Sequence, residues 1–350
     1  MNIFETRTML AAIREGFGAR SFLRDRYFSN VRTFDTARID IDIVKGKRRL
    51  APFVHPKIGG KTVERAGFRT DSYEAPEVSP DMVTTAEDML NRSPGEHIYG
   101  ARSPQERAAE QLGRDLLELD EMITRREEAM AAEALFTGKI TIVGEGYDEE
   151  LHYWPSDPAE RPYIELVGDA VWSNSASTPT LDLRHARRDI TKTGATPTDV
   201  IMGTDALDAF LARLEAQKMA LDYRRVDMGH IDPQHLPNGV TYWGYLKDSA
   251  LDVYTYDEWY IDDEGVEKPM VPGNLVLVGS PQVATTMAYG VVSLMRGSGD
   301  NAAPEFYGER RVPDSWTQRK NPAGRIVQIK SKPLPIINQI DGFRVIKVLA

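Results

Sequence analysis

The sequence predicts an α+β protein that combines one very long helix, one long charged hairpin and one smaller unit of alternating helices and strands. Three observations lead to this prediction. A full set of helix start and stop signals encloses residues 103–138. Residues 37–44 alternate apolar and charged side chains, as a strand with one wet face does. From residue 181 onward, helical and strand patterns follow one another. A chain of 350 residues is long enough for more than one domain.

The first 35 residues are predicted to form a short amphipathic helix followed by an arm. The apolar side of that helix would comprise Phe4, Met9, Leu10 and Ile13. Residues 21–34 read SFLRDRYFSNVRTF and are dense in aromatic and arginine side chains. They are too few to form a core of their own, so we expect the arm to dock on another surface.

Residues 36–90 are predicted to form a long hairpin. The strand at residues 37–44 continues through residues 51–56, the chain turns at residues 59–60, and residues 61–78 return with weaker alternation. Such a hairpin has too little apolar content to be stable by itself. We therefore expect it to lie on another surface, such as a neighbouring subunit.

The charge of the hairpin is unevenly distributed. Residues 45–69 hold eight basic side chains against Glu64 alone, so 8 − 1 = +7, while the whole chain carries −10 and the remainder therefore −17. The basic residues are Lys45, Lys47, Arg48, Arg49, Lys57, Lys61, Arg65 and Arg69. Residues 70–90 carry six acidic side chains and no lysine or arginine. A basic limb followed by an acidic limb is unusual inside one small core.

The long helix is the clearest element of the chain. Ser103 is a good N-cap, Pro104 suits the first helical position, Glu106 completes a capping box, and Gly138 supplies a left-handed stop. One apolar stripe comprises Leu112, Leu116, Leu119 and Ile123. About 33 residues span about 50 Å. A coiled coil is less favoured because residues 124–128 are too polar to sustain heptads.

The remaining segments predict an α/β unit followed by returning strands. Residues 139–146 are predicted as a strand and turn, and residues 181–194 as a helix ending at Gly194. Further expected elements are a buried strand at 199–203, a helix at 205–217, strands at 239–246, 251–261 and 273–279, and two strands in 324–350. Residues 274–295 carry no charge, but their glycines, Pro281 and threonines favour strand, turn and short helix over a membrane span.

Composition excludes several classes of function. The chain has no cysteine, which rules out disulfides, cysteine nucleophiles and thiolate metal sites. Charged residues lie among the first 17, so no signal peptide is expected. A net charge of −10 is opposite in sign to that of a protein that coats DNA.

No nucleotide, metal or catalytic site is predicted. The string HPKIGGKT ends like a phosphate-binding loop, but His55 stands where the first glycine belongs and Pro56 removes a backbone donor. We interpret it as the tip of the hairpin. No pair of histidines has the spacing of a zinc helix, and His230 and His235 fall in a polar loop. The sequence G-x-S-x-G is absent, since RGSGD at residues 296–300 does not match it.

For an acidic cluster in residues 257–264, the alternatives are a calcium site, an acid–base site and an acidic turn. Its members are Asp257, Glu258, Asp262, Asp263 and Glu264. They do not match the calcium-binding loop, and they fall where a hairpin turn is expected. An acidic turn is the favoured interpretation. The chain is therefore predicted to have no cofactor, no bound metal and no catalytic residues.

The order of these parts, and several local strings, resemble the major capsid proteins of tailed bacteriophages, in particular the lambda-type major head protein family (phage capsid protein E). The strings are FLRDRYF with FDTARIDID, APFVHPKIGG, EALFTGKITIVGEGYDE and YIDDEGVEKPMVPGNLVLVG. They are colinear over nearly the whole chain. The resemblance implies the Hong Kong phage capsid fold and self-assembly into an icosahedral shell around double-stranded DNA, without catalytic residues.

The same resemblance implies a division into parts. It comprises an N-arm at 1–35, an E-loop at 36–92, a P-domain at 93–177 with a spine helix at 104–136, an A-domain at 178–324, and strands returning to the P-domain at 325–350. Assembly would take place in the bacterial cytoplasm, and the product would be the capsid of the virion. Expected partners are further copies in pentamers and hexamers, a separate scaffolding protein, a portal, a decoration protein, and packaged DNA bound without sequence specificity, but no membrane.

Two sets of residues are predicted to contact neighbouring subunits. In the E-loop they are Arg48, Arg49, Lys57, Gly59, Gly60, Lys61, Arg65 and Arg69. In the N-arm they are Phe22, Arg24, Arg26, Tyr27 and Phe28. Alternatively, the E-loop charges pair within the hairpin, with Asp71, Glu74 and Glu77. No Lys–Asn cross-link is expected. An encapsulin-type shell, an α/β enzyme, and a polysaccharide- or nucleic-acid-binding module remain alternative functions.

Overall fold

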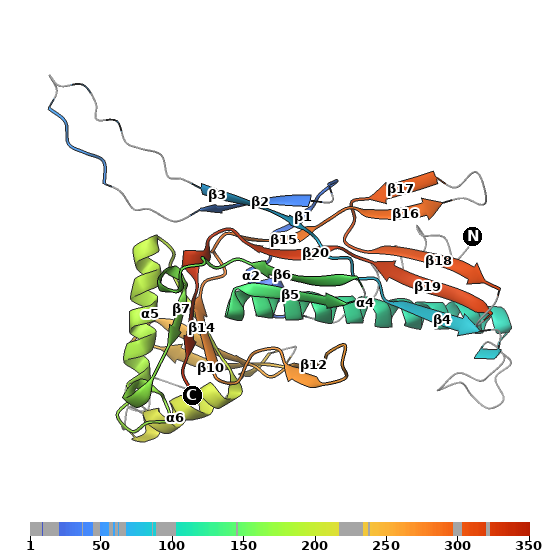
Figure 1. The fold of residues 1–350 in the computed structure, drawn as a ribbon. Helices are drawn as coiled ribbons and strands as arrows, with labels where there is room; N and C mark the ends of the chain where they lie inside the picture. Colours follow the sequence, from blue (N-terminus) through green and yellow to red (C-terminus); the bar gives the residue numbers. More distant parts are fainter. Residues whose placement is uncertain are drawn as a thin grey trace.

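The computed structural model of the protein is elongated, with the long helix running along it and an α/β unit at one end (Figure 1). The residues that it describes are Met9, 21–36, 38–44, 50–55, 59, 62, 68–85, 87–88, 103–144, 146–216, 234–236, 239–296, 303–319 and 323–350. The predicted N-terminal helix lies outside these residues except for Met9, which is helical and buried.

The long helix α4 (Pro104–Thr137) begins and ends as predicted. The Ser103 side chain accepts a hydrogen bond from the Glu106 N–H, and the Glu106 side chain accepts one from the Ser103 N–H. Gly138 ends the helix with φ of 65°. The predicted apolar stripe is buried together with Met9 against two β-strand residues, Val327 and Ile329. Tertiary packing of this stripe, rather than helix propensity alone, therefore stabilises the long helix.

We expect glycine-to-alanine changes at the two glycines of this region to have opposite effects. At Gly138 a Cβ atom would lie 2.0 Å from the Trp154 ring in a left-handed backbone conformation, so Gly138→Ala should destabilise the protein by more than about 1 kcal/mol. At Gly113, inside α4, a Cβ atom meets nothing within 4 Å, so Gly113→Ala should stabilise by about 0.5–1 kcal/mol. Urea unfolding measures the change in unfolding free energy of each variant, and two changes of the same sign would contradict this account.

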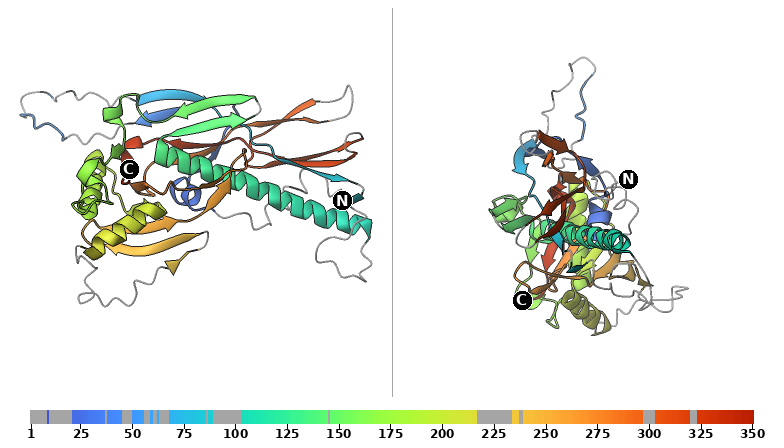
Figure 2. Two further views of the ribbon diagram at one scale, coloured as in Figure 1. Left: turned by 60° about the horizontal axis from the view of Figure 1, so that its bottom comes forward. Right: turned by 90° about the vertical axis from the view of Figure 1, so that its right-hand side faces the viewer.

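A seven-stranded mixed sheet forms the α/β unit. Its strand order is β7-β21-β14-β8-β11-β10-β9. The strands are β7 (Tyr163–Glu165), β8 (Asp199–Met202), β9 (Gln234–His235), β10 (Val240–Leu246), β11 (Leu251–Tyr256), β14 (Leu275–Gly279) and β21 (Arg344–Lys347). Two helices, α5 (Pro179–Thr193) and α6 (Thr204–Ala216), cover one face (Figure 2). Within β8, Val200 and Met202 face these helices, whereas Ile201 faces the core that contains the end of α4.

Smaller sheets flank the long helix. One comprises β18 (Val312–Gln318), β19 (Gly324–Lys330) and β4 (Asp81–Thr85), and another comprises β1 (Val31–Thr33), β15 (Thr285–Tyr289) and β20 (Pro333–Ile337). Four hairpins are β2 (Arg38–Val44) with β3 (Phe68–Glu74), β5 (Lys139–Gly144) with β6 (Tyr147–His152), β12 (Trp259–Ile261) with β13 (Glu267–Pro269), and β16 (Val292–Arg296) with β17 (Ala303–Tyr307). Short helical turns are α2 (Leu23–Tyr27), η1 (Pro158–Glu160), η2 (Gly168–Ala170) and η4 (Ile340–Gly342).

The structure corrects two of the predicted elements. The short helix expected before residue 295 is absent from the described residues 274–295, because β15 and β16 occupy this segment and β15 pairs with both β1 and β20. The first strand of the hairpin does not continue through residues 51–56, since the described residues 51–55 have no regular structure.

The sheets also divide the chain differently from the predicted domain boundaries. Strands β7 and β21, expected in the P-domain, lie in the seven-stranded sheet, where β21 pairs with β14 and β7. Strand β18, expected in the A-domain, pairs with β19 beside α4. The buried backbone of β14 needs hydrogen-bonding partners on the side away from β8, and the backbone of β21 supplies them. Val345 and Ile346 of β21 are buried in this position.

Candidate functional site

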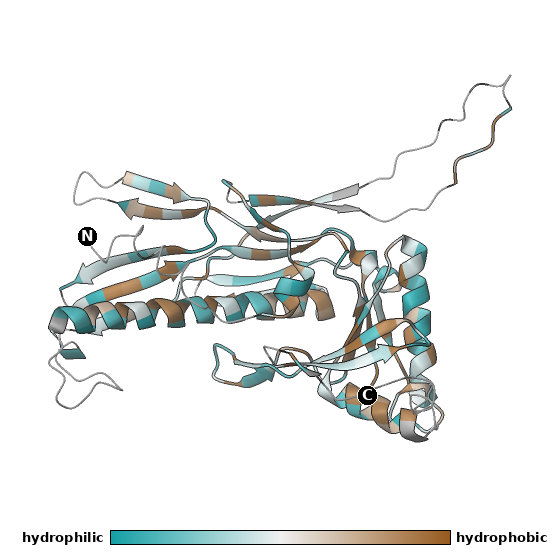
Figure 3. Cartoon of the chain, turned by 180° about the vertical axis from the view of Figure 1, so that it is seen from behind, coloured by the Kyte–Doolittle hydropathy of each residue, from teal (hydrophilic) through white to brown (hydrophobic). Residues whose placement is uncertain are grey.

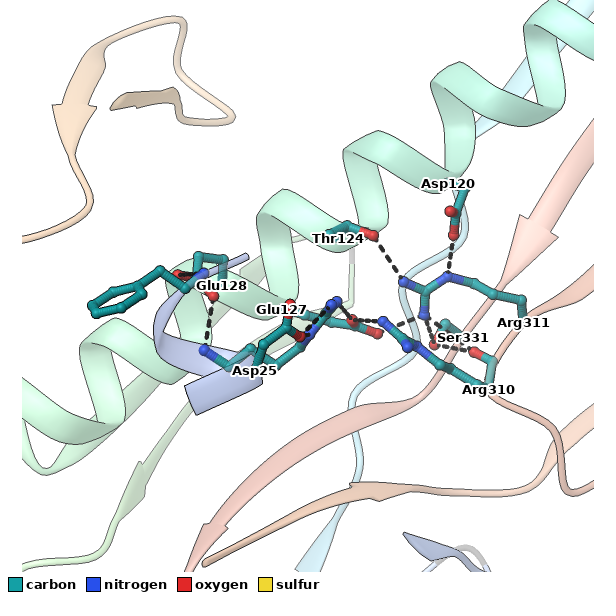
Figure 4. Close-up of polar contacts among 10 residues, drawn as sticks. Asp25, Asp120, Thr124, Glu127, Glu128, Arg310, Arg311 and Ser331 are labelled. Carbon is teal, nitrogen blue, oxygen red and sulfur yellow. Dashed lines mark hydrogen bonds and ion pairs between the residues drawn. The ribbon is translucent and has the colours of Figure 1, made fainter. Parts of the chain in front are cut away.

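The arm docks on the last third of the long helix through two adjacent carboxylates, the first of which is that of Glu128. Glu128 of α4 is 2% exposed and accepts hydrogen bonds from three consecutive backbone N–H groups at the start of α2 (Figure 4). The donors are Phe22 at 3.0 Å, Leu23 at 2.7 Å and Arg24 at 2.9 Å. The first N–H groups of a helix have no partner within that helix. Glu128 therefore supplies from a distant part of the chain the cap that α2 lacks in its own sequence.

The preceding residue, Glu127, joins three arginines from two segments, the arm and residues 310–311. Its carboxylate is fully buried and lies 2.7 Å from Arg24 Nη1, 3.1 Å from Arg310 Nη2 and 2.5 Å from Arg311 Nη1. Arg311 is only 5% exposed and also reaches Asp120 at 2.7 Å. Thr124 and Ser331 satisfy further donors of Arg311, and Asp25 pairs with Arg24. We call this set of side chains the Glu127 cluster.

The electrostatics of the Glu127 cluster favour the charged state. Burial alone would raise the pKa of Glu127, but Arg311, followed by Arg310 and Arg24, lowers that pKa from 4.5 to about 2. Burial raises the pKa of the neighbouring Glu128, against the opposing effect of the three backbone donors. Two adjacent carboxyl groups on one helix therefore differ in what they require. Glu127 needs its charge, because it faces arginines, whereas Glu128 needs mainly its oxygen atoms as acceptors.

The pKa of Glu127 predicts a pH dependence of stability. Because the folded-state pKa lies below the unfolded value of 4.5, the stabilisation by this charge is complete above pH 4.5 and is lost as the pH falls through about 2. The difference in unfolding free energy between the natural protein and Glu127→Gln should therefore be constant near neutral pH and shrink below pH 4.5. Urea unfolding between pH 3 and pH 7 measures it, and a difference that grows toward low pH would contradict the assignment.

The arm also contacts the seven-stranded sheet. Arg26 Nε lies 2.6 Å from Asp199 Oδ2 of β8, and its guanidinium lies 4.7 Å from the centre of the Tyr254 ring of β11. The Tyr27 hydroxyl donates to the same Asp199 oxygen at 3.3 Å. The five-residue helix α2 thus bonds to α4 on one side and to the sheet on the other. This arrangement fixes the long helix and the α/β unit relative to one another.

The predicted contact residues of the N-arm are used within the chain. Tyr27 and Phe28 are each 1% exposed in the main core, and Arg24 and Arg26 form the ion pairs described above. Phe22 packs with its ring centre 5.6 Å from that of Tyr256. The structure therefore corrects the prediction for Tyr27 and Phe28, because burial in their own subunit leaves no surface for a neighbour.

Two of the predicted E-loop contact residues, Gly59 and Arg69, are among the residues that the structure describes. Arg48, Arg49, Lys57, Gly60, Lys61 and Arg65 lie outside the described residues. Arg69 contributes its backbone to β3, opposite Ile43 of β2. A Cβ atom added at Gly59 would meet no atom within 4 Å. Leu50 and Phe53, which the sequence analysis did not single out, have relative exposures of 96% and 106%. Figure 1 shows residues 50–55 beyond the end of the β2–β3 hairpin and far from the rest of the molecule.

One feature of the sequence indicates the Glu127 cluster: a glutamate lies on the apolar stripe of the long helix. The apolar stripe of α4 steps from Leu119 to Ile123 by four residues, and the next step of four reaches Glu127. A carboxylate on the buried stripe of a helix requires a buried cation. The polarity of residues 124–128 argued correctly against a coiled coil, but it also marked the place where the arginines bind. Which arginines these were could not be read from the sequence.

The acidic cluster and His235 form local hydrogen bonds in the structure. The Asp262 side chain accepts hydrogen bonds from the Glu264 and Val266 N–H groups and pairs with Lys268 at 2.6 Å, as the predicted acidic turn requires. His235 contacts Thr241, while His230 lies outside the described residues. Within the described part of the chain, no group of three or more potential ligands could hold a metal ion. No helix that the structure describes is long and apolar enough to cross a membrane.

Comparison with known proteins gives consistent matches over the full length. The chain matches the family of phage major capsid protein E over residues 5–348. It is 24% identical to the major capsid protein of Escherichia phage lambda over 349 residues, which covers 98% of each chain. It is 23% identical to that of Escherichia phage N15 over 350 residues, which covers 99% of this chain and 100% of the other.

Solved structures give the same result for the fold. The putative capsid protein of a prophage of E. coli CFT073 superposes with a TM-score of 0.68 at 21% identity, covering 99% of each chain. A capsid chain of cyanophage A-1(L) has a TM-score of 0.50 at 12% identity, covering 96% of this chain and 94% of the other.

The projecting hairpin, the long helix and the sheet unit joined by a docked arm thus define the Hong Kong phage type of capsid fold. The chain belongs to the phage major capsid protein E family. It is a structural component of the virion, where copies assemble into the icosahedral shell of a tailed phage. The family match favours this function over the encapsulin-type shell.

Proposed function

We propose that this chain builds its shell from pentamers and hexamers in which the E-loop of each copy lies on a neighbouring copy. The observation that supports this most is the exposure of Leu50 and Phe53 at 96% and 106% on a hairpin that projects from the body. Burying a side chain of this kind contributes about 1.5–3 kcal/mol. The proposal includes the predicted E-loop charges Arg48, Arg49, Lys57, Lys61, Arg65 and Arg69 as further intersubunit contacts.

The proposal extends to the parts of the chain and its partners. The N-arm, E-loop, P-domain and A-domain keep their predicted boundaries, except that β7 and β21 belong to the A-domain and β18 to the P-domain. Assembly requires a separate scaffolding protein and a portal, the finished shell encloses double-stranded DNA without reading its sequence, and a decoration protein binds outside. The chain catalyses no reaction. Each contact between subunits contributes little free energy, but the contact is repeated over a closed shell, so the total stabilisation is large.

Negative-stain electron microscopy tests this function directly. The purified protein is imaged alone and together with the product of the neighbouring scaffold gene. Closed shells, or rings of five and six subunits, are the expected result. A compact monomer that never assembles under either condition would overturn the proposal.

Changing the exposed apolar pair should impair assembly without affecting the folded subunit. In Leu50→Ser/Phe53→Ser, the two side chains contact nothing in their own body, so the free energy of unfolding should change by less than about 0.5 kcal/mol. The yield of shells in the assembly assay should fall at least about tenfold, because about 3 kcal/mol of burial is lost at every such contact. The matched control, Leu50→Met/Phe53→Leu, keeps apolar surface and should assemble. Normal assembly of the serine variant would contradict the role of the loop.

A further inference from the structure

The two helices that cover the A-domain sheet carry charges of opposite sign. Within α5 the basic residues Arg184, Arg187, Arg188 and Lys192 outnumber Asp182 and Asp189, so 4 − 2 = +2. Within α6 the acidic residues Asp205, Asp208 and Glu215 outnumber Arg213, so 1 − 3 = −2. In Figure 1 the helix α5 lies along the left edge of the A-domain and α6 along its lower edge. The two charged surfaces therefore lie at different edges of one subunit.

The basic surface is built around a shallow hollow on α5. The hollow has a volume of about 560 Å³, and its lining residues are Arg184, Arg187, Arg188, Thr191, Lys192 and Asp248. Arg184 pairs with Asp248 at 2.6 Å and Lys192 with Asp189 at 2.8 Å. Arg187 and Arg188 form no ion pair with any residue that the structure describes. Leu183, Ala186 and Ile190 of α5 are buried, so the polar side of the helix is turned outward, as its colouring shows (Figure 3).

The acidic surface combines α6 with the end of β11. Asp205 and Asp208 lie on the exposed side of α6, opposite the buried Ala206, Leu207 and Phe210. Asp257, which follows β11, is also exposed, and its pKa is raised by burial and by the nearby charge of Asp208. These three carboxylates form no ion pair within the described residues. No ion pair between described residues joins α5 to α6.

We propose that the basic surface of α5 binds the acidic surface of α6 of the next copy around the axis of each pentamer or hexamer. This inference rests on the proposed function. A rotational ring of more than two subunits needs two different, complementary surfaces on each subunit. A self-complementary contact would instead place arginine against arginine, and like charges across an interface are strongly unfavourable. The second copy, rather than nucleic acid, is the favoured occupant because the same subunit carries the matching acidic surface.

Cross-linking gives the sharpest test, because the natural chain has no cysteine. Shells of the double variant Arg188→Cys/Asp208→Cys are treated with a bis-maleimide and analysed on a denaturing gel. We expect ladders that end at five and six subunits. Each single variant should give no ladder, because a heterologous contact brings unlike surfaces together. A control that pairs Arg188→Cys with Glu121→Cys on α4 should also give none. Absence of the ladder from the double variant would overturn the inference.

Charge reversal is a second test of the inference, and it also tests whether α5 contacts DNA instead of a second copy. Arg187→Glu/Arg188→Glu and Asp205→Lys/Asp208→Lys should each lower the yield of rings and shells at least about tenfold, and their combination should restore it, because attraction replaces repulsion. All positions are on helix surfaces, so far-UV circular dichroism should not change. If the α5 variant assembles normally but retains less DNA, and the α6 variant is neutral, α5 faces nucleic acid and the inference is wrong. If the natural protein forms no rings or shells, the proposed function itself fails.

Discussion

Replacing Glu127 by glutamine should destabilise the protein by about 3–5 kcal/mol, because breaking a buried ion pair from one side leaves the opposite charge uncompensated. Glutamine keeps the size of the side chain but removes the charge that Arg24, Arg310 and Arg311 share. Arg311 is 5% exposed and, among the residues that the structure describes, retains only Asp120 as an anionic partner. Urea unfolding of the purified subunit, followed by circular dichroism, measures the loss.

The matched control for this change is on the same helix. Glu121 forms an exposed ion pair with Arg125 at 2.9 Å, one turn away. Exposed pairs of this kind contribute only about 0–1 kcal/mol. Glu121→Gln should therefore be nearly neutral, although it removes the same charge from the same helix. If both variants lost the same stability, the effect would come from helix charge in general rather than from the buried cluster.

Replacing Glu128 by alanine should release the arm from the long helix. Three N–H groups at the start of α2 lose their acceptor. Those of Leu23 and Arg24 are buried and that of Phe22 is part-buried, and each buried unsatisfied donor costs about 1–3 kcal/mol. We expect a total loss of about 3–5 kcal/mol and, more specifically, tryptic cleavage after Arg24 and Arg26 in conditions where the natural protein resists. Limited proteolysis with mass analysis of the fragments detects it.

The isosteric change at the same position should be milder. In Glu128→Gln the remaining oxygen can still accept from Phe22 and Leu23, whereas the new amide faces the Arg24 N–H. A loss of about 1–3 kcal/mol is expected, with a mostly protected arm. At Glu127, by contrast, the glutamine variant is already strongly destabilised, because the charge of the side chain matters there more than its oxygen atoms. An arm that resists trypsin in the alanine variant would show that the packing of Tyr27 and Phe28 holds it without the cap.

The two adjacent glutamates link assembly to the fold of the single subunit. In the proposed assembly each subunit uses its E-loop and the edges of its A-domain as contact surfaces, so these parts need a fixed relation within each subunit. The arm supplies it, because Arg24 is bonded to α4 and Arg26 to Asp199 of the sheet. A capsid subunit with a released arm would therefore fold its two units but present its contact surfaces at variable angles.

The large groove beside the long helix is separate from this junction. It has a volume of about 850 Å³ and lies between α4, the β5–β6 hairpin and the β12–β13 hairpin. The tip of the β12–β13 hairpin reaches α4 through Arg126 and Asp263, 2.5 Å apart. This exposed pair also connects the two units, but it is weaker than the Glu127 cluster because solvent screens it.

The sequence by itself determined the local elements whose signals lie within a few residues. Ser103, Glu106 and Gly138 placed the ends of the long helix, and Gly194 placed the end of α5. Alternation predicted β2, but not where it ends, because a strand of a two-stranded hairpin continues only as far as its partner, here β3. The order of the parts also predicted the capsid family, since that order is itself a one-dimensional property of the chain.

Only the tertiary structure decided which distant residues meet. Glu127 and Arg311 are 184 residues apart, and Arg26 and Asp199 are 173 residues apart, so no local pattern could pair them. The same holds for the division of the strands, because β21 joined β14 by hydrogen bonding across the sheet rather than by its place in the chain. The arm looked like a contact for another subunit for the same reason. Aromatic and arginine side chains indicate that a segment binds a surface, but only the fold shows that the surface belongs to its own chain.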